Sequence, residues 1–96
     1  MEDNNSGSPP KKDKPLIQIA LGSEVRVRRL ALGVSQEGFA DHAGFHRTYI
    51  GSLERGEINI SLGNLYAIAI ALNCQPHDLI VPISKGMKVN GRLAKS

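Results

Sequence analysis

Apolar residues recur at helical spacing along most of the chain and predict a series of short helices. Within residues 16–32, Leu21, Val25 and Leu32 fall on one stripe, because side chains three or four positions apart share a face of a helix. Position 29 completes this stripe but holds an arginine. A guanidinium on a core-facing stripe is costly unless it is paired, so we expect a carboxylate from another segment to meet Arg29.

Caps and glycines separate the helices that follow. Gly33 is placed to end the first helix, and Ser35 to cap a second helix that runs to about residue 42. Gly44 lies in a break of three residues before a third helix over residues 46–54. The buried faces of these two helices are predicted at Phe39, Ala40, Ala43, Ile50 and Leu53.

An apolar run and a proline mark the last two helices. After Ser61, the spacing of Leu62, Leu65, Ile68, Ala69 and Leu72 predicts a fourth helix. Pro76 suits the first position of a short fifth helix. No segment reads as a strand, so the predicted fold class is all-α, a compact domain of five short helices.

Length and composition predict one small domain with two polar ends. Ninety-six residues are too few for a large active-site cleft or for two separate cores. Residues 1–15 hold three prolines and no large apolar side chain after Met1, so we expect a disordered N-terminal arm there. The folded domain is expected over residues 16–82, and a basic, fraying tail over residues 83–96.

The charge balance fits an anionic partner without proving one. The net charge is +3, from 12 basic and 9 acidic residues. Residues 1–15 are neutral overall, so the whole excess lies downstream. A mildly basic domain of this kind is compatible with nucleic-acid binding.

Other classes of function find no support in the sequence. One cysteine excludes a disulfide framework and a four-thiolate zinc site, and the three histidines and Cys74 have no metal-ligand spacing. No apolar run reaches the roughly 18 residues that span a bilayer, so we expect a cytoplasmic protein without membrane contact. No catalytic arrangement can be recognised, so we expect no enzymatic activity, no cofactor and no small-molecule ligand.

The second and third helices, with their short break, have the spacing of a helix-turn-helix. Residues 21–80 resemble the DNA-binding domain of lambda repressor and Cro-like regulators, the xenobiotic-response-element family. Within this family, the run HRTYIGSLERGEINISLGNL over residues 46–65 is most similar to the controller proteins of restriction-modification systems. The resemblance implies a lambda-repressor-like fold in which the third helix enters the major groove of DNA.

This resemblance implies a set of base contacts on the third helix. They are Arg47, Thr48, Gly51 and Ser52. Arg47 is suited to paired hydrogen bonds with guanine, which are worth about 1–3 kcal/mol of discrimination. Gly51 has two explanations that remain open: close approach of the backbone to the bases, or close packing against another helix.

The resemblance also implies contacts with the DNA backbone. Phosphate contacts are expected at Ser35, Gln36, Tyr49, Arg55, Asn59 and Asn64. Caps and turns are the alternative role for the polar residues, and packing beside the fourth helix is the alternative for Tyr49. His46 stands where the family often has a better capping residue, so it is a possible DNA contact with pH-sensitive binding.

A buried ion pair is implied for the charged position in the first helix. In related repressors, the first-helix arginine pairs with the glutamate that ends the third helix. Arg29 and Glu54 occupy these two positions. We therefore expect them to have a structural role.

Domain size favours a homodimer on a two-fold DNA operator, because one small module buries only about 600–1,000 Å² against DNA. The expected dimer interface is the fifth helix with the end of the fourth, at Leu79, Ile80, Val81 and Ile83. The predicted partners are therefore double-stranded DNA and a second copy of the chain. The hypothesis is a sequence-specific transcription regulator, and the resemblance implies a restriction-modification controller that regulates its own gene. The alternatives are a phage-type or antitoxin-type repressor, and a helix-turn-helix protein-interaction module that does not read DNA.

Overall fold

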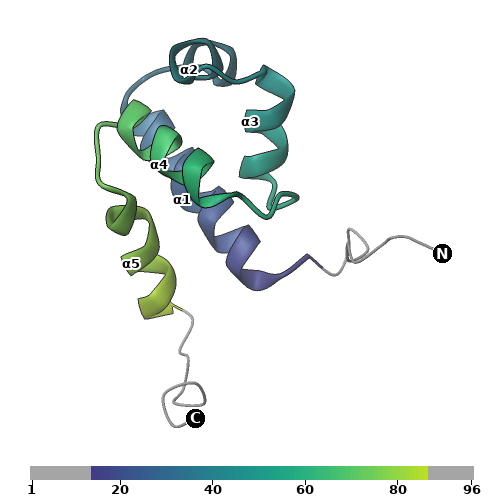
Figure 1. Cartoon of the computed structure of the whole chain (residues 1–96), viewed down its shortest axis with the longest axis vertical. Coiled ribbons are helices and arrows are strands. Elements are labelled where there is room, and N and C mark those ends of the chain that lie inside the picture. The colour runs from purple at the N-terminus through teal and green to yellow at the C-terminus, as the bar shows by residue number, and fades with distance from the viewer. Residues whose placement is uncertain (1–13, 87–96) are drawn as a thin grey trace, which may run out of the picture.

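The computed structural model describes residues 14–86, with side chains described up to residue 83. This part of the chain forms five helices and no strand (Figure 1). The helices are α1 (Leu16–Ala31), α2 (Gln36–Ala43), α3 (Arg47–Glu54), α4 (Leu62–Ala71) and α5 (Pro76–Gly86). The predicted all-α fold with five helices is thereby confirmed. The expected N-terminal arm up to residue 13 and the expected tail beyond residue 86 lie outside the described residues.

Serine caps and left-handed glycines set the helix boundaries. The Ser35 hydroxyl accepts a hydrogen bond from the Gly38 amide at 2.9 Å and begins α2. The Ser61 hydroxyl begins α4 in the same way. Gly33 and Gly44 follow α1 and α2 with φ angles of 75° and 84°, a conformation that glycine adopts without steric cost.

The core lies in the middle of the five helices, where α1 contacts α3 and α5, and α4 contacts α2 and α5. Helices α2 and α3 pack together at one end, and α5 packs against α1 and α4 at the other. The largest fully buried side chains are Val25, Phe39, Ile50, Leu53, Ile68 and Leu79. All five helices contribute side chains to this one cluster. The inner face of α3 therefore rests on a continuous apolar core, and its outward face does not.

Two apolar positions that were predicted to be buried are exposed. The exposed fraction is 44% for Leu32 and 80% for Leu62. Leu32 is the C-cap residue directly after α1, and Leu62 is the first residue of α4. Both therefore lie at helix ends that no neighbouring helix covers, although their helical spacing is correct.

Two glycines allow α1 to pack directly on α3 and on the loop behind it. A Cβ atom at Gly22 would overlap the carbonyl oxygen of Leu53. A Cβ atom at Gly56, whose φ angle is 78°, would lie 2.8 Å from the Cα atom of Ile19. These contacts fix the end of α3 at a short distance from α1.

Helix α5 continues through Pro82 to Gly86, past the residue where the tail was expected to begin. Proline has no amide hydrogen and cannot bond the carbonyl four residues earlier, which here belongs to Asp78. The Arg28 guanidinium of α1 donates to this carbonyl oxygen at 3.3 Å. Arg28 also pairs with Glu24 at 2.8 Å, so a side chain of α1 supports α5 at its proline.

Candidate nucleic-acid interface

Helices α2 and α3 are joined by a tight turn over residues 44–46. The amides of Gly44 and Phe45 both donate to the carbonyl of Ala40 at 2.9 Å. Ile50 and Leu53 of α3 face the core and are 0% and 1% exposed. The opposite face of α3 is therefore left for solvent or for a partner.

A buried ion pair anchors α3 to α1. Arg29 donates to both carboxylate oxygens of Glu54, from Nε at 2.6 Å and from Nη2 at 3.0 Å, and from Nη1 to the Val34 carbonyl at 2.9 Å. The exposed fractions of the two side chains are 7% and 3%. The hydrogen bond from Glu54 raises the pKa of Arg29 above its usual value, against the opposing effect of burial. Arg29 thus meets the carboxylate that its place on the core stripe requires.

The side chain of Gln36 faces α3 instead of solvent. Its amide nitrogen donates to Glu54 Oε1 at 2.9 Å. The Ser35 hydroxyl is occupied by the cap of α2. In the first turn of a helix the leading amides have no intrahelical partner, so the backbone amides of Gln36 and Glu37 are the groups that this helix end offers to an anion.

The four residues of α3 that were predicted to contact bases differ in their exposure to solvent. Arg47 and Thr48 are exposed and Ser52 is half-buried, whereas Gly51 is buried. A Cβ atom at Gly51 would lie 3.2 Å from Arg55 Nη1 and 3.6 Å from Gln36 Oε1. The side chains of Arg55, directly after α3, and of Gln36, from α2, therefore lie over the bare backbone of this glycine.

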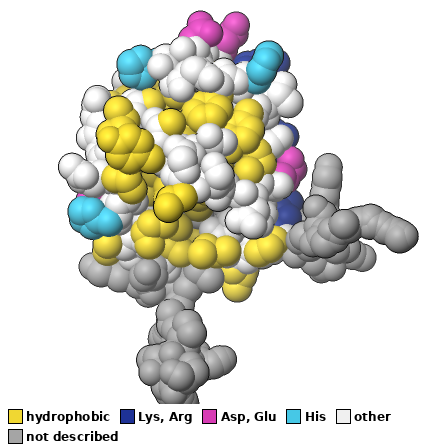
Figure 2. Space-filling view, viewed as in Figure 1, with side chains coloured by type: hydrophobic (Ala, Val, Ile, Leu, Met, Phe, Trp, Pro, Cys, Tyr) yellow, Lys and Arg dark blue, Asp and Glu magenta, His cyan; other side chains and the backbone are white. Residues whose placement is uncertain are grey.

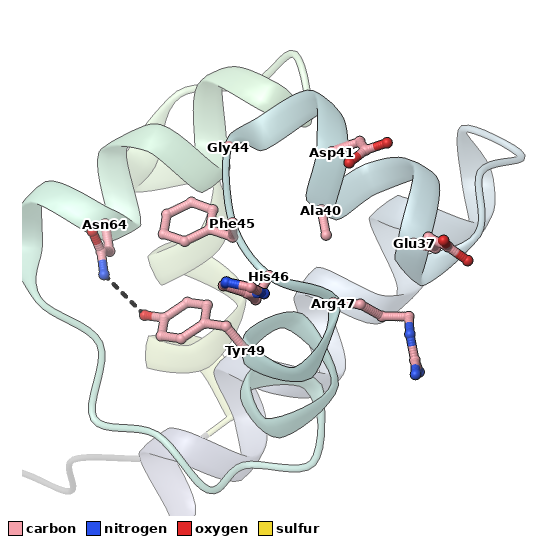
Figure 3. Close-up of a pocket in the computed structure, with 9 residues that line it drawn as sticks. All are labelled: Glu37, Ala40, Asp41, Gly44, Phe45, His46, Arg47, Tyr49 and Asn64. Atoms are coloured by element: carbon pink, nitrogen blue, oxygen red, sulfur yellow. Dashed lines mark hydrogen bonds between the residues drawn. The ribbon is translucent and has the colours of Figure 1, made fainter.

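An aromatic pair flanks the beginning of α3 (Figure 3). The rings of Phe45 and Tyr49 stack with centroids 4.9 Å apart at an angle of 12°. The Tyr49 hydroxyl accepts a hydrogen bond from Asn64 Nδ2 at 3.1 Å, so this tyrosine packs beside α4. Arg47 extends away from the ribbon on the side of α2, and exposed His46 lies between it and the tyrosine. Together these side chains line a shallow hollow at the turn.

Comparison with known proteins identifies this arrangement. A family model described as helix-turn-helix matches residues 25–79. The chain belongs to this helix-turn-helix family. The predicted family and the expectation of a transcription regulator that is not an enzyme are confirmed by this membership and by its relatives.

The relatives of this helix-turn-helix protein include several control proteins. It is 45% identical over 65 residues to the control protein C.BamHI of Bacillus amyloliquefaciens, covering 67% of this chain and 80% of the relative. It is 47% identical over 64 residues to the control protein C.SmaI of Serratia marcescens, covering 67% and 76%. The crystal structure of the restriction-modification controller protein C.AhdI from Aeromonas hydrophila matches with a TM-score of 0.63 and 40% identity, over 65% of this chain and 94% of that one.

A repressor bound to DNA is also similar in structure. The P22 c2 repressor in complex with a synthetic operator matches with a TM-score of 0.58 and 32% identity, over 62% of this chain and 89% of that one. The helix-turn-helix fold of this chain is thus shared with a protein solved on DNA.

The residues predicted for the dimer interface divide into two groups. Leu79 and Ile83 are 0% and 6% exposed and belong to the core of the protomer. Their assignment to a surface was wrong, because both point from α5 toward the packed helices. Ile80 and Val81 are 37% and 40% exposed, so they remain available for contact with a second copy of the chain.

Helix α4 adds exposed apolar side chains along its whole length, and not only at the end that was expected in the interface. Leu62, Tyr66 and Ile70 recur every fourth residue on its outer side and are 80%, 59% and 52% exposed. Hydrophobic side chains gather on the front of the molecule in Figure 2, on the side where α4 and α5 lie in Figure 1, and charged side chains are at the rim. We call the set Leu62, Tyr66, Ile70, Ile80 and Val81 the α4–α5 face.

Glu57 is a further residue that sequence reasoning missed. It lies in the loop after α3, where helical periodicity carries no information. Its carboxylate accepts two hydrogen bonds from Arg55, from Nε at 3.1 Å and from Nη2 at 3.3 Å. Asn59, a predicted phosphate contact, is exposed in the same loop.

No metal site and no membrane-crossing helix occur in the part of the chain that the structure describes. Histidine, cysteine and acidic side chains form no group of three that is placed to hold a metal ion there. No helix within residues 14–86 has the length and apolar character to cross a membrane.

Proposed function

We propose that this protein is a sequence-specific transcription regulator that binds a two-fold DNA operator as a homodimer. The observation that carries the proposal is the exposed outer side of α3, with Arg47 and Thr48 in its first turn beside the amino end of α2. Helix α3 is fixed by a buried ion pair and by glycine contacts with α1. A rigid helix with polar side chains on its free side is suited to the major groove.

The residues divide into base-reading and backbone-binding roles. Arg47 offers paired donors to guanine, and Thr48 offers a hydroxyl and a methyl group to a neighbouring base. The amides at the beginning of α2 bind a phosphate with the help of the helix dipole. Tyr49 and Asn64, which are hydrogen-bonded to one another, complete the contacts with the DNA backbone together with Asn59. The Ser35 hydroxyl caps α2 and the Gln36 side chain binds Glu54, so Gln36 contacts the phosphate through its main-chain amide.

Dimerisation takes place through the α4–α5 face. The long stretch of residues 58–76 contains no charged side chain, and its exposed members form much of this face. Pairing two such faces removes apolar surface from water. Two recognition helices related by a two-fold axis then enter major grooves about 34 Å apart.

The biological role is that of a controller that regulates its own gene and a neighbouring one. The similarity to the control proteins C.BamHI and C.SmaI supports this role. The test is binding to the DNA upstream of the protein's own coding sequence, against a scrambled duplex of equal composition, over a series of salt concentrations.

A controller gives a complex that resists the scrambled competitor and weakens steeply as salt rises. Equal binding of the two duplexes overturns autoregulation. If no duplex selected from a random pool binds even at low salt, DNA binding itself is refuted, and the protein-interaction module takes its place.

The dimer has a separate test with a matched control. Ile70→Glu places a charge on the α4–α5 face, at a residue that is 52% exposed. Val27→Glu places the same charge on the outer side of α1, at a residue that is 58% exposed. Light scattering should find that only the first variant is monomeric. Two dimeric variants, or two monomeric ones, would contradict the assignment of the interface.

A further inference from the structure

Arg55 extends the outer side of α3 by one more position. Thr48, Ser52 and Arg55 are four and three residues apart, so they follow one another along the same side of the helix. The side chain of Arg55 is 58% exposed. The last turn of α3 therefore presents a guanidinium beside the surface that carries Thr48.

The guanidinium of Arg55 is held by two neighbours. The Glu57 carboxylate accepts hydrogen bonds from Nε at 3.1 Å and from Nη2 at 3.3 Å. The Ser52 hydroxyl accepts a further hydrogen bond from Nη2 at 3.3 Å. The third nitrogen, Nη1, has no hydrogen-bond acceptor among the described residues and lies over Gly51. Since each terminal guanidinium nitrogen carries two donors, Nη1 presents a pair of donors in a fixed direction.

Glu57 is itself fixed in position. Its side chain is only 21% exposed, and Lys14 Nζ lies 3.8 Å from its Oε2 atom. The same Lys14 nitrogen donates to the backbone carbonyl of Arg55 at 2.8 Å. A flexible exposed arginine is thus held by a carboxylate on a restrained loop, and ordering a side chain before binding reduces the entropy that binding costs.

We infer that Glu57 is a positioning residue that determines specificity: it holds Arg55 so that Nη1 reads the acceptors of a base in the major groove. The inference rests on the proposed function and deepens it, because Arg55 then contacts a base and not only a phosphate. The two hydrogen bonds to Glu57 occupy Nε and Nη2, the edge of the guanidinium with which arginine otherwise binds a phosphate. Glu57 consequently favours base reading and disfavours binding to any sequence.

The experiment compares the wild-type protein with Glu57→Gln and Glu57→Asp. The probes are a duplex that the wild type selects from a random pool and a scrambled duplex of equal composition. The control is Glu24→Gln, which removes the same charge from the Glu24–Arg28 pair on α1. Thermal unfolding of each variant verifies that it is folded.

Both Glu57 variants should lose about 2- to 12-fold in the ratio of the two affinities, the factor expected for an arginine that must be ordered on binding. The aspartate keeps the charge but shortens the fork, so its loss separates geometry from charge. In Glu57→Gln, binding to the scrambled duplex should strengthen. Its salt slope should steepen by about 0.9 for a newly contacted phosphate. Glu24→Gln should leave the ratio within about twofold of the wild type, the size of a weak surface pair.

A double variant tests whether Glu57 acts through Arg55, with Arg55→Ala as the starting protein. If Glu57 acts through Arg55, adding Glu57→Gln to Arg55→Ala should change the affinity ratio no further. An unchanged ratio in both single variants, or a full loss in the Arg55→Ala background, would overturn the inference. A wild-type protein that does not discriminate between duplexes would instead refute the proposed function.

Discussion

Replacing Glu54 with alanine removes the carboxylate that joins α1 to α3. The carboxylate accepts three hydrogen bonds, two from Arg29 and one from Gln36. After the substitution, Arg29 keeps only the Val34 carbonyl as a partner among these contacts. The guanidinium stays charged in a site where the residue is 5% exposed.

The loss in stability follows from this stranded charge. Breaking a buried ion pair by removing one partner costs about 3–5 kcal/mol. A domain of this size has a free energy of unfolding of roughly 5–10 kcal/mol. We therefore expect Glu54→Ala to remove about half of the stability of the fold and to weaken DNA binding by loosening α3.

Urea denaturation followed by circular dichroism measures this change. The control is Glu24→Ala, which breaks the more exposed pair between Glu24 and Arg28 and should cost less than about 1 kcal/mol. If Glu54→Ala lowers the free energy of unfolding by no more than the control does, the ion pair does not anchor α3 and the reasoning is wrong.

Three further substitutions or measurements test other parts of the structure. Gly51→Ala should raise stability by up to about 1 kcal/mol through helix propensity while displacing Arg55 and reducing the preference for the selected duplex; a destabilised variant with unchanged preference would contradict this. Arg28→Ala should lower stability by about 1 kcal/mol in urea, because the Asp78 carbonyl loses its donor; no change would remove the assigned support for α5. Burial raises the pKa of the Cys74 thiol above its ordinary value of 9.0. The folded state therefore retains this proton longer than the unfolded state does, and the stability it contributes is present below pH 9 and lost as pH rises through the folded pKa. Between pH 9 and 10, wild-type stability should fall more steeply than that of Cys74→Ala; parallel curves would refute the assignment.

Most of the fold could be predicted from local signals in the sequence. The caps at Ser35 and Ser61 and the glycines at 33 and 44 mark helix ends by chemistry that acts within a few residues. Periodicity gives the direction of a side chain but not what covers it. For this reason Leu62 was expected inside, and Leu79 was expected on a surface.

The candidate site was predictable where a residue conflicts with its pattern. An arginine on the apolar stripe of α1 requires a buried carboxylate, and Glu54 supplies it. The fork between Arg55 and Glu57 has no such signal, since one partner is in a loop. Likewise, the packing over Gly51 joins side chains from α2 and from the end of α3, which only the folded structure brings together.

If the outer side of α3 reads bases, removal of one of its side chains should abolish discrimination at one base pair of the operator half-site. Wild-type protein and Arg47→Ala are titrated against the selected duplex and against a panel with each base pair replaced in turn. The variant should become indifferent to one base pair in each half-site, a loss of about 1–3 kcal/mol of discrimination, and should remain selective elsewhere. If the variant instead discriminates at every position as the wild type does, α3 does not read DNA through Arg47.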